Sequence, residues 1–225
     1  MPVALVTGAS RGLGLATARA LAARGWSLVL DARGGAELEA ATAGLGATTL
    51  AGDVSDPVHR AQLVHAVRRS GRLDLLLNNA SVLGPSPQPA LRAYPLDALR
   101  AVYEVNVLAP LALVQDLLPL LTGGTVVDIS SDAAVEAYEG WGGYGSAKAA
   151  LDHLTAILAV EHHDLRFYAV DPGDMNTRLH QQAFPGEDIS DRPLPETVVP
   201  ALLRLLDERP PSGRYRAADL LPVAP

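Results

Sequence analysis

The chain has 225 residues, of which 48% are hydrophobic and 19% charged, with a formal net charge of −7. This composition is typical of a folded protein with a sizeable core and excludes a disordered chain. Lys and Arg form no block, so we expect no nucleic acid partner and no anionic membrane partner. Cysteine is absent, which excludes disulfides, thiolate metal sites and a cysteine nucleophile.

The N-terminal residues predict no targeting segment. The apolar run at residues 3–6 is too short for a signal peptide and follows no basic segment. No apolar run in the sequence suggests a membrane span. We therefore expect a cytoplasmic protein, and its length suits a single domain over residues 1–225.

In chain order, short apolar runs alternate with longer segments of helical period. The predicted strands are residues 3–6, 27–30, 48–50, 74–77, 125–129, 165–170 and 214–217. The predicted helices are residues 13–24, 36–43, 56–69, 96–121, 145–163 and 196–208; the third begins with Asp56 as N-cap and Pro57 at its first position. This alternation predicts an α/β fold of the Rossmann type, a doubly wound parallel sheet of about seven strands with helices on both faces.

A glycine-rich turn, Thr7 to Gly14, joins the first predicted strand to its helix. A dinucleotide pyrophosphate binds backbone N–H groups at a helix N-terminus, where side chains would block its approach. The three glycines, at 8, 12 and 14, therefore predict a cofactor site. Their spacing is similar to the T-G-x-x-x-G-x-G turn of the short-chain dehydrogenase/reductase family.

The end of the second strand reads Asp31-Ala32-Arg33. In this family, Ala32 stands where NAD-preferring members have an acidic residue, and Arg33 where NADP-preferring members have a basic one. Arg33, with Arg11 from the glycine turn, would pair with a 2′-phosphate, which favours NADP(H). If the strand ends one residue earlier, Asp31 would bind the ribose and NAD(H) would be preferred.

Tyr144 and Lys148 lie four residues apart in a predicted helix, and therefore on one face of it. A nearby ammonium favours the phenolate form of a tyrosine, which makes the tyrosine proton transferable. Tyr144 is therefore predicted as the general acid/base. The pair resembles the Y-x-x-x-K motif of the same family.

Two further residues resemble members of the family's catalytic group. Ser131 follows the fifth strand, thirteen residues before Tyr144, and the resemblance implies that its hydroxyl donates to the reacting oxygen; Ser130 is the adjacent alternative. Asn106 interrupts an apolar helix and needs a polar partner. The resemblance implies that Asn106 supports a water-linked proton relay through Lys148.

The resemblance continues over residues 3 to about 217 and implies further cofactor contacts. Asn79 and Ala80 look like part of the family's N-N-A-G segment, although Ser81 replaces its glycine. The cofactor-binding residues expected on this basis are Gly8, Ser10, Arg11, Gly12, Leu13, Gly14, Arg33, Asp53, Val54, Asn79, Ala80, Tyr144, Lys148, Pro172, Gly173, Met175 and Thr177.

These features predict an NADP(H)-dependent oxidoreductase that interconverts a carbonyl and a secondary alcohol by hydride transfer. Two alternatives remain on the same fold: a catalytically silent NADP-binding regulator or partner subunit, and non-redox lyase or epimerase chemistry. The histidines lack metal-ligand spacing, so no metal is expected. The substrate is predicted to be a small carbonyl or alcohol compound held by segments 132–143 and 178–195, and the family resemblance implies a homodimer or homotetramer.

Overall fold

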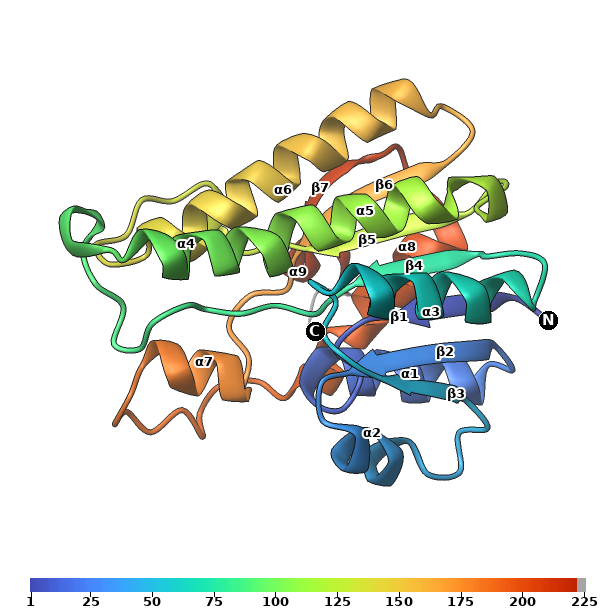
Figure 1. Cartoon of the computed structure of the whole chain (residues 1–225), viewed down its shortest axis with the longest axis horizontal. Coiled ribbons are helices and arrows are strands. Elements are labelled where there is room, and N and C mark those ends of the chain that lie inside the picture. Colours follow the sequence, from blue (N-terminus) through green and yellow to red (C-terminus); the bar gives the residue numbers. More distant parts are fainter. Residues whose placement is uncertain (222–225) are drawn as a thin grey trace.

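A computed structural model describes residues 1–221, and residues 222–225 lie outside it. Seven parallel strands form one sheet in the order β3-β2-β1-β4-β5-β6-β7 (Figure 1). This confirms the predicted α/β fold. The strands are β1 (Val3–Val6), β2 (Ser27–Ala32), β3 (Thr48–Ala51), β4 (Leu75–Asn78), β5 (Thr125–Ile129), β6 (Arg166–Asp171) and β7 (Gly213–Arg216).

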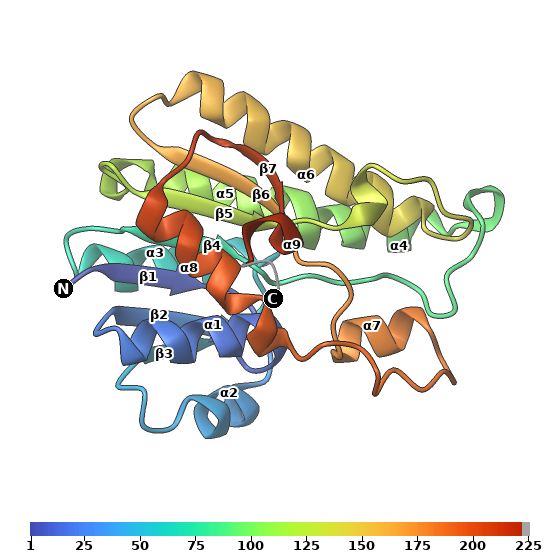
Figure 2. The ribbon, with the colours of Figure 1, turned by 180° about the vertical axis from the view of Figure 1, so that it is seen from behind.

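Helices cover both faces of the sheet (Figures 1 and 2). One face carries α3 (Pro57–Arg68), α5 (Ala109–Leu117) and α6 (Gly142–Glu161), with α4 (Leu96–Tyr103) extending beyond the strands. The other face carries α1 (Gly12–Ala23) and α8 (Val199–Glu208). Shorter helices are α2 (Gly35–Thr42), α7 (Arg178–Ala183) and α9 (Ala217–Leu220), and α7 lies away from the sheet.

The alternation of side chains along each strand builds two separate cores. In β1, Val3 and Leu5 face the cluster that includes α3 and α5, whereas Ala4 and Val6 face the cluster that includes α1 and α8. All four residues are buried because a parallel sheet is covered on both sides. This explains why the predicted strands are continuous apolar runs.

The single helix predicted over residues 96–121 is divided in the structure. Between α4 and α5 the chain makes a π-helical turn at Glu104–Leu108, and a 3₁₀ turn at Leu118–Leu120 follows α5. The stretch Leu96–Leu120 contains an 18-residue window with a mean hydropathy of 1.4, so that by length and composition it could cross a membrane, contrary to the expectation that no apolar run suggests a membrane span. Leu113, Val114 and Leu117 of this stretch are buried in the protein core. Core helices can be as apolar as membrane-spanning helices, so the composition alone does not indicate a membrane span.

Helix α6 begins three residues before its predicted start. Gly142 and Gly143 look like turn residues in the sequence, yet both are helical. A Cβ atom at Gly142 would lie 2.3 Å from the Leu91 side chain, and one at Gly143 would lie 2.3 Å from the Tyr94 ring. The glycines therefore allow close packing against the loop before α4.

A buried Asp–His pair connects β2, α3 and the glycine turn. Asp31 Oδ1 accepts the Gly8 N–H at 2.8 Å, and Asp31 Oδ2 lies 3.1 Å from His59 Nε2. Both side chains are at most 3% exposed. Hydrogen bonding to Asp31 raises the pKa of His59 above its ordinary value. The pair thus fixes the start of the glycine turn against the sheet.

Asp56 acts as the predicted N-cap of α3, because its carboxylate accepts the Val58 N–H at 2.9 Å. We predict that Asp56→Ala lowers the free energy of unfolding by about 1 kcal/mol. Asp56→Ser keeps an accepting oxygen and should preserve most of the stability. Denaturant unfolding of both variants tests this, and equal losses in the two would contradict the capping role.

The Asp31–His59 pair predicts a pH-dependent stability. The pKa of His59 is higher in the folded chain than in the unfolded chain, where it is about 6.5. The contribution of the charged His59 to the free energy of unfolding is therefore complete below about pH 6.5, and it is lost as the pH rises through the folded pKa. His59→Gln keeps a hydrogen-bond donor without the charge. The variant should therefore lose more unfolding free energy near about pH 6 than near about pH 9. A pH-independent difference would mean that His59 is not charged in the fold.

Candidate active site

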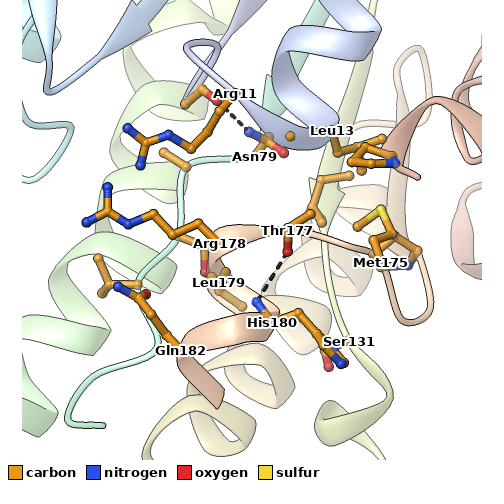
Figure 3. Close-up of a pocket in the computed structure, with 18 of the residues that line it drawn as sticks. Arg11, Leu13, Asn79, Ser131, Met175, Thr177, Arg178, Leu179, His180 and Gln182 are labelled. Atoms are coloured by element: carbon orange, nitrogen blue, oxygen red, sulfur yellow. Dashed lines mark hydrogen bonds between the residues drawn. The ribbon is translucent and has the colours of Figure 1, made fainter. Parts of the chain in front are cut away.

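A cleft of about 730 Å³ opens at the carboxyl ends of the strands, where α/β sheets of this type bind ligands. The order of the strands reverses between β1 and β4, and the glycine turn lies at this point. Figure 3 shows Arg11 and Asn79 on one side of the cleft and Thr177, Arg178 and Leu179 on another. Segments distant in sequence thus meet around one cavity.

The glycine turn has no space for side chains. Gly8 has a φ of +68° and Gly12 a φ of +56°, which favour glycine. A Cβ atom at Gly8 would lie 2.9 Å from Asn79 Nδ2, and one at Gly14 would lie 2.5 Å from the same atom. Asn79 donates to the carbonyl oxygens of Thr7 and Gly8 at 2.8 and 3.1 Å. The bare backbone of the turn is therefore held open to the cleft.

This cradle fits a nicotinamide dinucleotide. Helix α1 begins at Gly12, and its N-cap Arg11 makes no side-chain capping hydrogen bond. First-turn N–H groups at such a helix end attract a pyrophosphate. The cleft is lined by these predicted cofactor residues: Gly8, Ser10, Arg11, Gly12, Leu13, Arg33, Asp53, Val54, Asn79, Ala80, Tyr144, Lys148, Pro172, Gly173, Met175 and Thr177. Gly14 lies directly behind the turn, against Gly8 and Asn79.

Two arginines stand at the adenosine end of the cleft. Arg33 is exposed. Burial acts to raise the pKa of Asp53, but hydrogen bonds from Ser55 and the nearby charge of Arg33 lower it, and the net shift is downward. Arg11 pairs with Glu37 of α2, its Nε lying 3.0 Å from Glu37 Oε1. Both partners are more than 40% exposed, and such a pair contributes less than about 1 kcal/mol. A phosphate could therefore displace Glu37.

Asp31, the alternative ribose acceptor, is 1% exposed. Its two carboxylate oxygens bind the Gly8 N–H and the His59 ring, as described above. The backbone carbonyl of Asp31 also accepts the Ala9 N–H at 2.8 Å. These contacts make Asp31 part of the scaffold of the turn and argue against the interpretation that favoured NAD(H).

Tyr144 and Lys148 lie on the face of α6 that looks into the cleft, and they are 6% and 2% exposed. Lys148 Nζ lies 5.5 Å from the centre of the Tyr144 ring and donates to the Ile129 carbonyl at 2.6 Å. Burial raises the pKa of Tyr144 above its ordinary value, and burial lowers the pKa of Lys148 to about 8. Tyr144 therefore retains its proton at neutral pH.

Two serines end β5, and the structure distinguishes them. Ser131 is partly exposed in the cleft, and its hydroxyl lies near enough to Tyr144 to lower the pKa of that phenol, an effect smaller than the rise caused by burial. Its own hydroxyl also donates to Asp132 Oδ1 at 2.8 Å. Ser130 is 1% exposed and lies beside the Asp152 carboxyl group. Both serines line the cleft, and Ser131 is the more accessible of the two.

Asn106 is fully buried in the π-helical turn, where its side-chain amide makes three hydrogen bonds. Asn106 Oδ1 accepts from the Val82 N–H at 2.9 Å and from the Ser81 hydroxyl at 3.2 Å, and its Nδ2 donates to the Val82 carbonyl at 2.9 Å. Ser81 lies near enough to Tyr144 to lower the pKa of that phenol, against the larger effect of burial. Asn106 therefore holds the segment after β4 in place and positions Ser81 beside Tyr144.

The predicted segment after β6 forms another wall of the cleft. Thr177 caps α7, because its hydroxyl accepts the His180 N–H at 3.2 Å (Figure 3). The Gly173 N–H donates to Asp171 Oδ1 at 3.0 Å, which fixes the turn after the strand. Pro172, Gly173, Met175 and Thr177 thus follow one another along the cleft.

Sequence reasoning missed Arg214, which connects four elements around the site. From β7 it donates to the Ser131 carbonyl at 2.9 Å, to Asp152 of α6 at 3.0 Å and to Asp171 of β6 at 3.4 Å. Neither this residue nor the contact of Ser81 with Tyr144 belongs to a local motif. For Asp31 and Asp171, the sequence gives a single indication of a structural role: each is an acidic residue directly after an apolar predicted strand. Within residues 1–221 no cluster of three metal-ligating side chains occurs.

Comparisons with known proteins agree with this geometry. Residues 2–188 match the family model described as short chain dehydrogenase. The chain is 35% identical to sepiapterin reductase of Rattus norvegicus over 80% of this chain and 77% of that protein. It is 34% identical to L-xylulose reductase of Bos taurus over 92% and 89% of the two chains.

Solved structures give the same result. A short-chain dehydrogenase from Shigella flexneri, in complex with NADP, superimposes with a TM-score of 0.90 at 27% identity. The similarity covers 96% of this chain and 97% of that one. Together with the family match and the cleft geometry, this shows that the chain belongs to the short-chain dehydrogenase family of oxidoreductases.

Proposed function

We propose that this protein is an NADP(H)-dependent oxidoreductase that interconverts a carbonyl and a secondary alcohol, with Tyr144 as general acid/base. One observation carries the proposal: Tyr144, Ser131 and Lys148 line one cleft, and the Lys148 ammonium lies 5.5 Å from the centre of the Tyr144 ring. A phenol that lies near an ammonium and a serine hydroxyl can give up and regain a proton.

In the direction of reduction, Tyr144 gives its proton to the carbonyl oxygen while Ser131 donates a hydrogen bond to that oxygen. The bound reduced nicotinamide supplies the hydride that the carbonyl carbon receives. Lys148 stabilises the phenolate that remains, because its ammonium lies beside the ring. Asn106 positions Ser81 and Val82, which line the cleft, through hydrogen bonds to both residues. The phenolate then regains a proton from solvent.

The preference for NADP(H) is supported by Arg33 and Arg11 at the adenosine end of the cleft. An arginine forms charge-assisted hydrogen bonds with a 2′-phosphate, and these bonds are stronger than those it can form with an uncharged 2′-hydroxyl. Asp31 is already engaged by Gly8 and His59. The NADP in the Shigella flexneri structure agrees with this choice.

The substrate is proposed to lie between segments 132–143 and 178–195 of one domain. Sepiapterin reductase and L-xylulose reductase are named for different substrates, so the relatives support only a small carbonyl or alcohol compound. For assembly, we propose a homodimer or homotetramer on the basis of the family resemblance, with exposed Leu108, Ile157 and Val160 as apolar side chains that a partner subunit would cover. The cytoplasmic location stays a prediction.

We predict that Tyr144→Phe lowers turnover by about 10²-fold or more, because the variant has no transferable proton. The dissociation constant for NADPH should change little, since the phenyl ring is kept. Consumption of reduced cofactor and a separate binding titration measure the two effects. Tyr215→Phe, outside the cleft, is the matched control. Turnover near that of the parent in Tyr144→Phe would contradict the assigned role.

The cofactor preference predicts a second result. Arg33→Ala should raise KM for NADPH about 10- to 100-fold, the effect expected when a charge-assisted hydrogen bond is lost, and should hardly change KM for NADH. Arg68→Ala removes an exposed arginine from α3 and serves as the control. Equal effects on the two cofactors would show that Arg33 does not bind the 2′-phosphate.

A further inference from the structure

Four aromatic rings meet at the substrate end of the cleft. The Trp141 ring lies 5.9 Å from the Tyr144 ring at an interplanar angle of 73°, and 5.9 Å from the Phe184 ring at 48°. The centre of the Tyr138 ring lies 6.2 Å from the centre of the Trp141 ring. Trp141 is the central ring of this group, and it lines the cleft together with Tyr144.

The position of Trp141 is set by the same helix that carries the proton donor. Trp141 is the N-cap of α6, and its carbonyl accepts the Gly145 N–H at 2.7 Å. The backbone N–H of Trp141 donates to the Tyr138 carbonyl at 3.2 Å. The backbone that carries the indole is therefore fixed at the start of α6, three residues before Tyr144.

Aliphatic side chains complete the apolar surface. Leu179 and Ala183 of α7 pack against the cluster of Leu83, Ala133 and Tyr144, as Trp141 does. Figure 3 places Leu179 in the interior of the cleft, on the segment that also carries Thr177. The space next to the reacting hydroxyl is thus bordered by a flat indole and by aliphatic groups.

Some polar groups near the aromatic rings are engaged with one another, whereas Arg178, His180 and Gln182 of α7 also line the cleft. Asp132 accepts from the Ser131 hydroxyl at 2.8 Å and from the Tyr138 hydroxyl at 3.0 Å. A polyhydroxylated substrate would bury several hydroxyl groups against this wall, and each hydroxyl without a partner would weaken binding. An aryl ring needs no hydrogen bonds and gains from contact with other aromatic rings.

We propose that the substrate is an aryl ketone, or the corresponding aryl carbinol, and that Trp141 is the residue that selects its ring. This inference rests on the proposed carbonyl reduction. The ring packs against the indole, and its carbonyl oxygen then points to the Tyr144 and Ser131 hydroxyls. The Phe184 and Tyr138 rings pack against the indole of Trp141 and hold it in its orientation.

A matched pair of ketones tests the inference. Methyl phenyl ketone and methyl cyclohexyl ketone have the same carbonyl substituent and rings of similar size, but only the first ring is flat and aromatic. With NADPH, we expect kcat/KM to be about 10-fold or more higher for the phenyl ketone. Trp141→Leu should remove most of this ratio through KM, whereas Trp141→Phe should retain it. Unfolding temperatures of both variants report on their folding.

A binding measurement separates the two proposals. Trp26→Phe, a change remote from the cleft, leaves Trp141 as the single tryptophan, and the phenyl ketone should quench its fluorescence saturably and at lower concentration than the cyclohexyl ketone. Such quenching without turnover of either ketone would overturn the redox proposal and keep the aryl site. Turnover of both ketones with equal kcat/KM, or an equal loss for both in Trp141→Leu, would overturn the aryl site. Neither turnover nor quenching would overturn both.

Discussion

The close approach of β4 to the glycine turn is the constraint on which the rest of the site depends. Asn79 lies so near that no Cβ atom fits at Gly8 or Gly14. The Thr7 hydroxyl accepts the N–H groups of Asn79 and Ala80, each at 3.0 Å. These contacts join the first and fourth strands at the point where the order of the sheet reverses, and they leave the backbone of the turn facing the cleft.

The catalytic group depends on a second set of long-range contacts. Lys148 is buried, and burial alone would disfavour its charge; Asp128 and Asp152 act against that effect. Asp128 is itself held by Asn78 at 2.8 Å and Thr155 at 2.7 Å. These two acidic groups thus help to maintain the Lys148 ammonium, to which the proposed mechanism gives the role of stabilising the Tyr144 phenolate. The same network fixes Ser131 through Arg214.

Much of this arrangement could be predicted from the sequence, because it is local. The strands, the glycine turn, the N-cap at Asp56 and the helical spacing of Tyr144 and Lys148 each depend on residues close in the chain. The family resemblance added Ser131 and Asn106. The structure places Tyr144, Lys148 and Ser131 around one cavity, while Asn106 is buried and holds Ser81, which also lines that cavity.

The remainder depends on contacts between residues far apart in sequence. Asp31 looked like a possible ribose acceptor, but its role is set by Gly8 and His59, 23 and 28 residues away. The glycines at the start of α6 looked like a turn because their neighbours Leu91 and Tyr94 lie in another segment. Likewise, the aromatic wall exists only because α7 brings Phe184 to Trp141.

The most direct test of the account follows the hydride itself. Reduction of methyl phenyl ketone with NADPH deuterated at C4 of the nicotinamide, on the transferred face, should place one deuterium on the carbinol carbon of the product. Mass spectrometry and NMR of the alcohol measure this transfer. A carbinol without deuterium at this carbon would contradict direct hydride transfer from the nicotinamide to the carbonyl carbon.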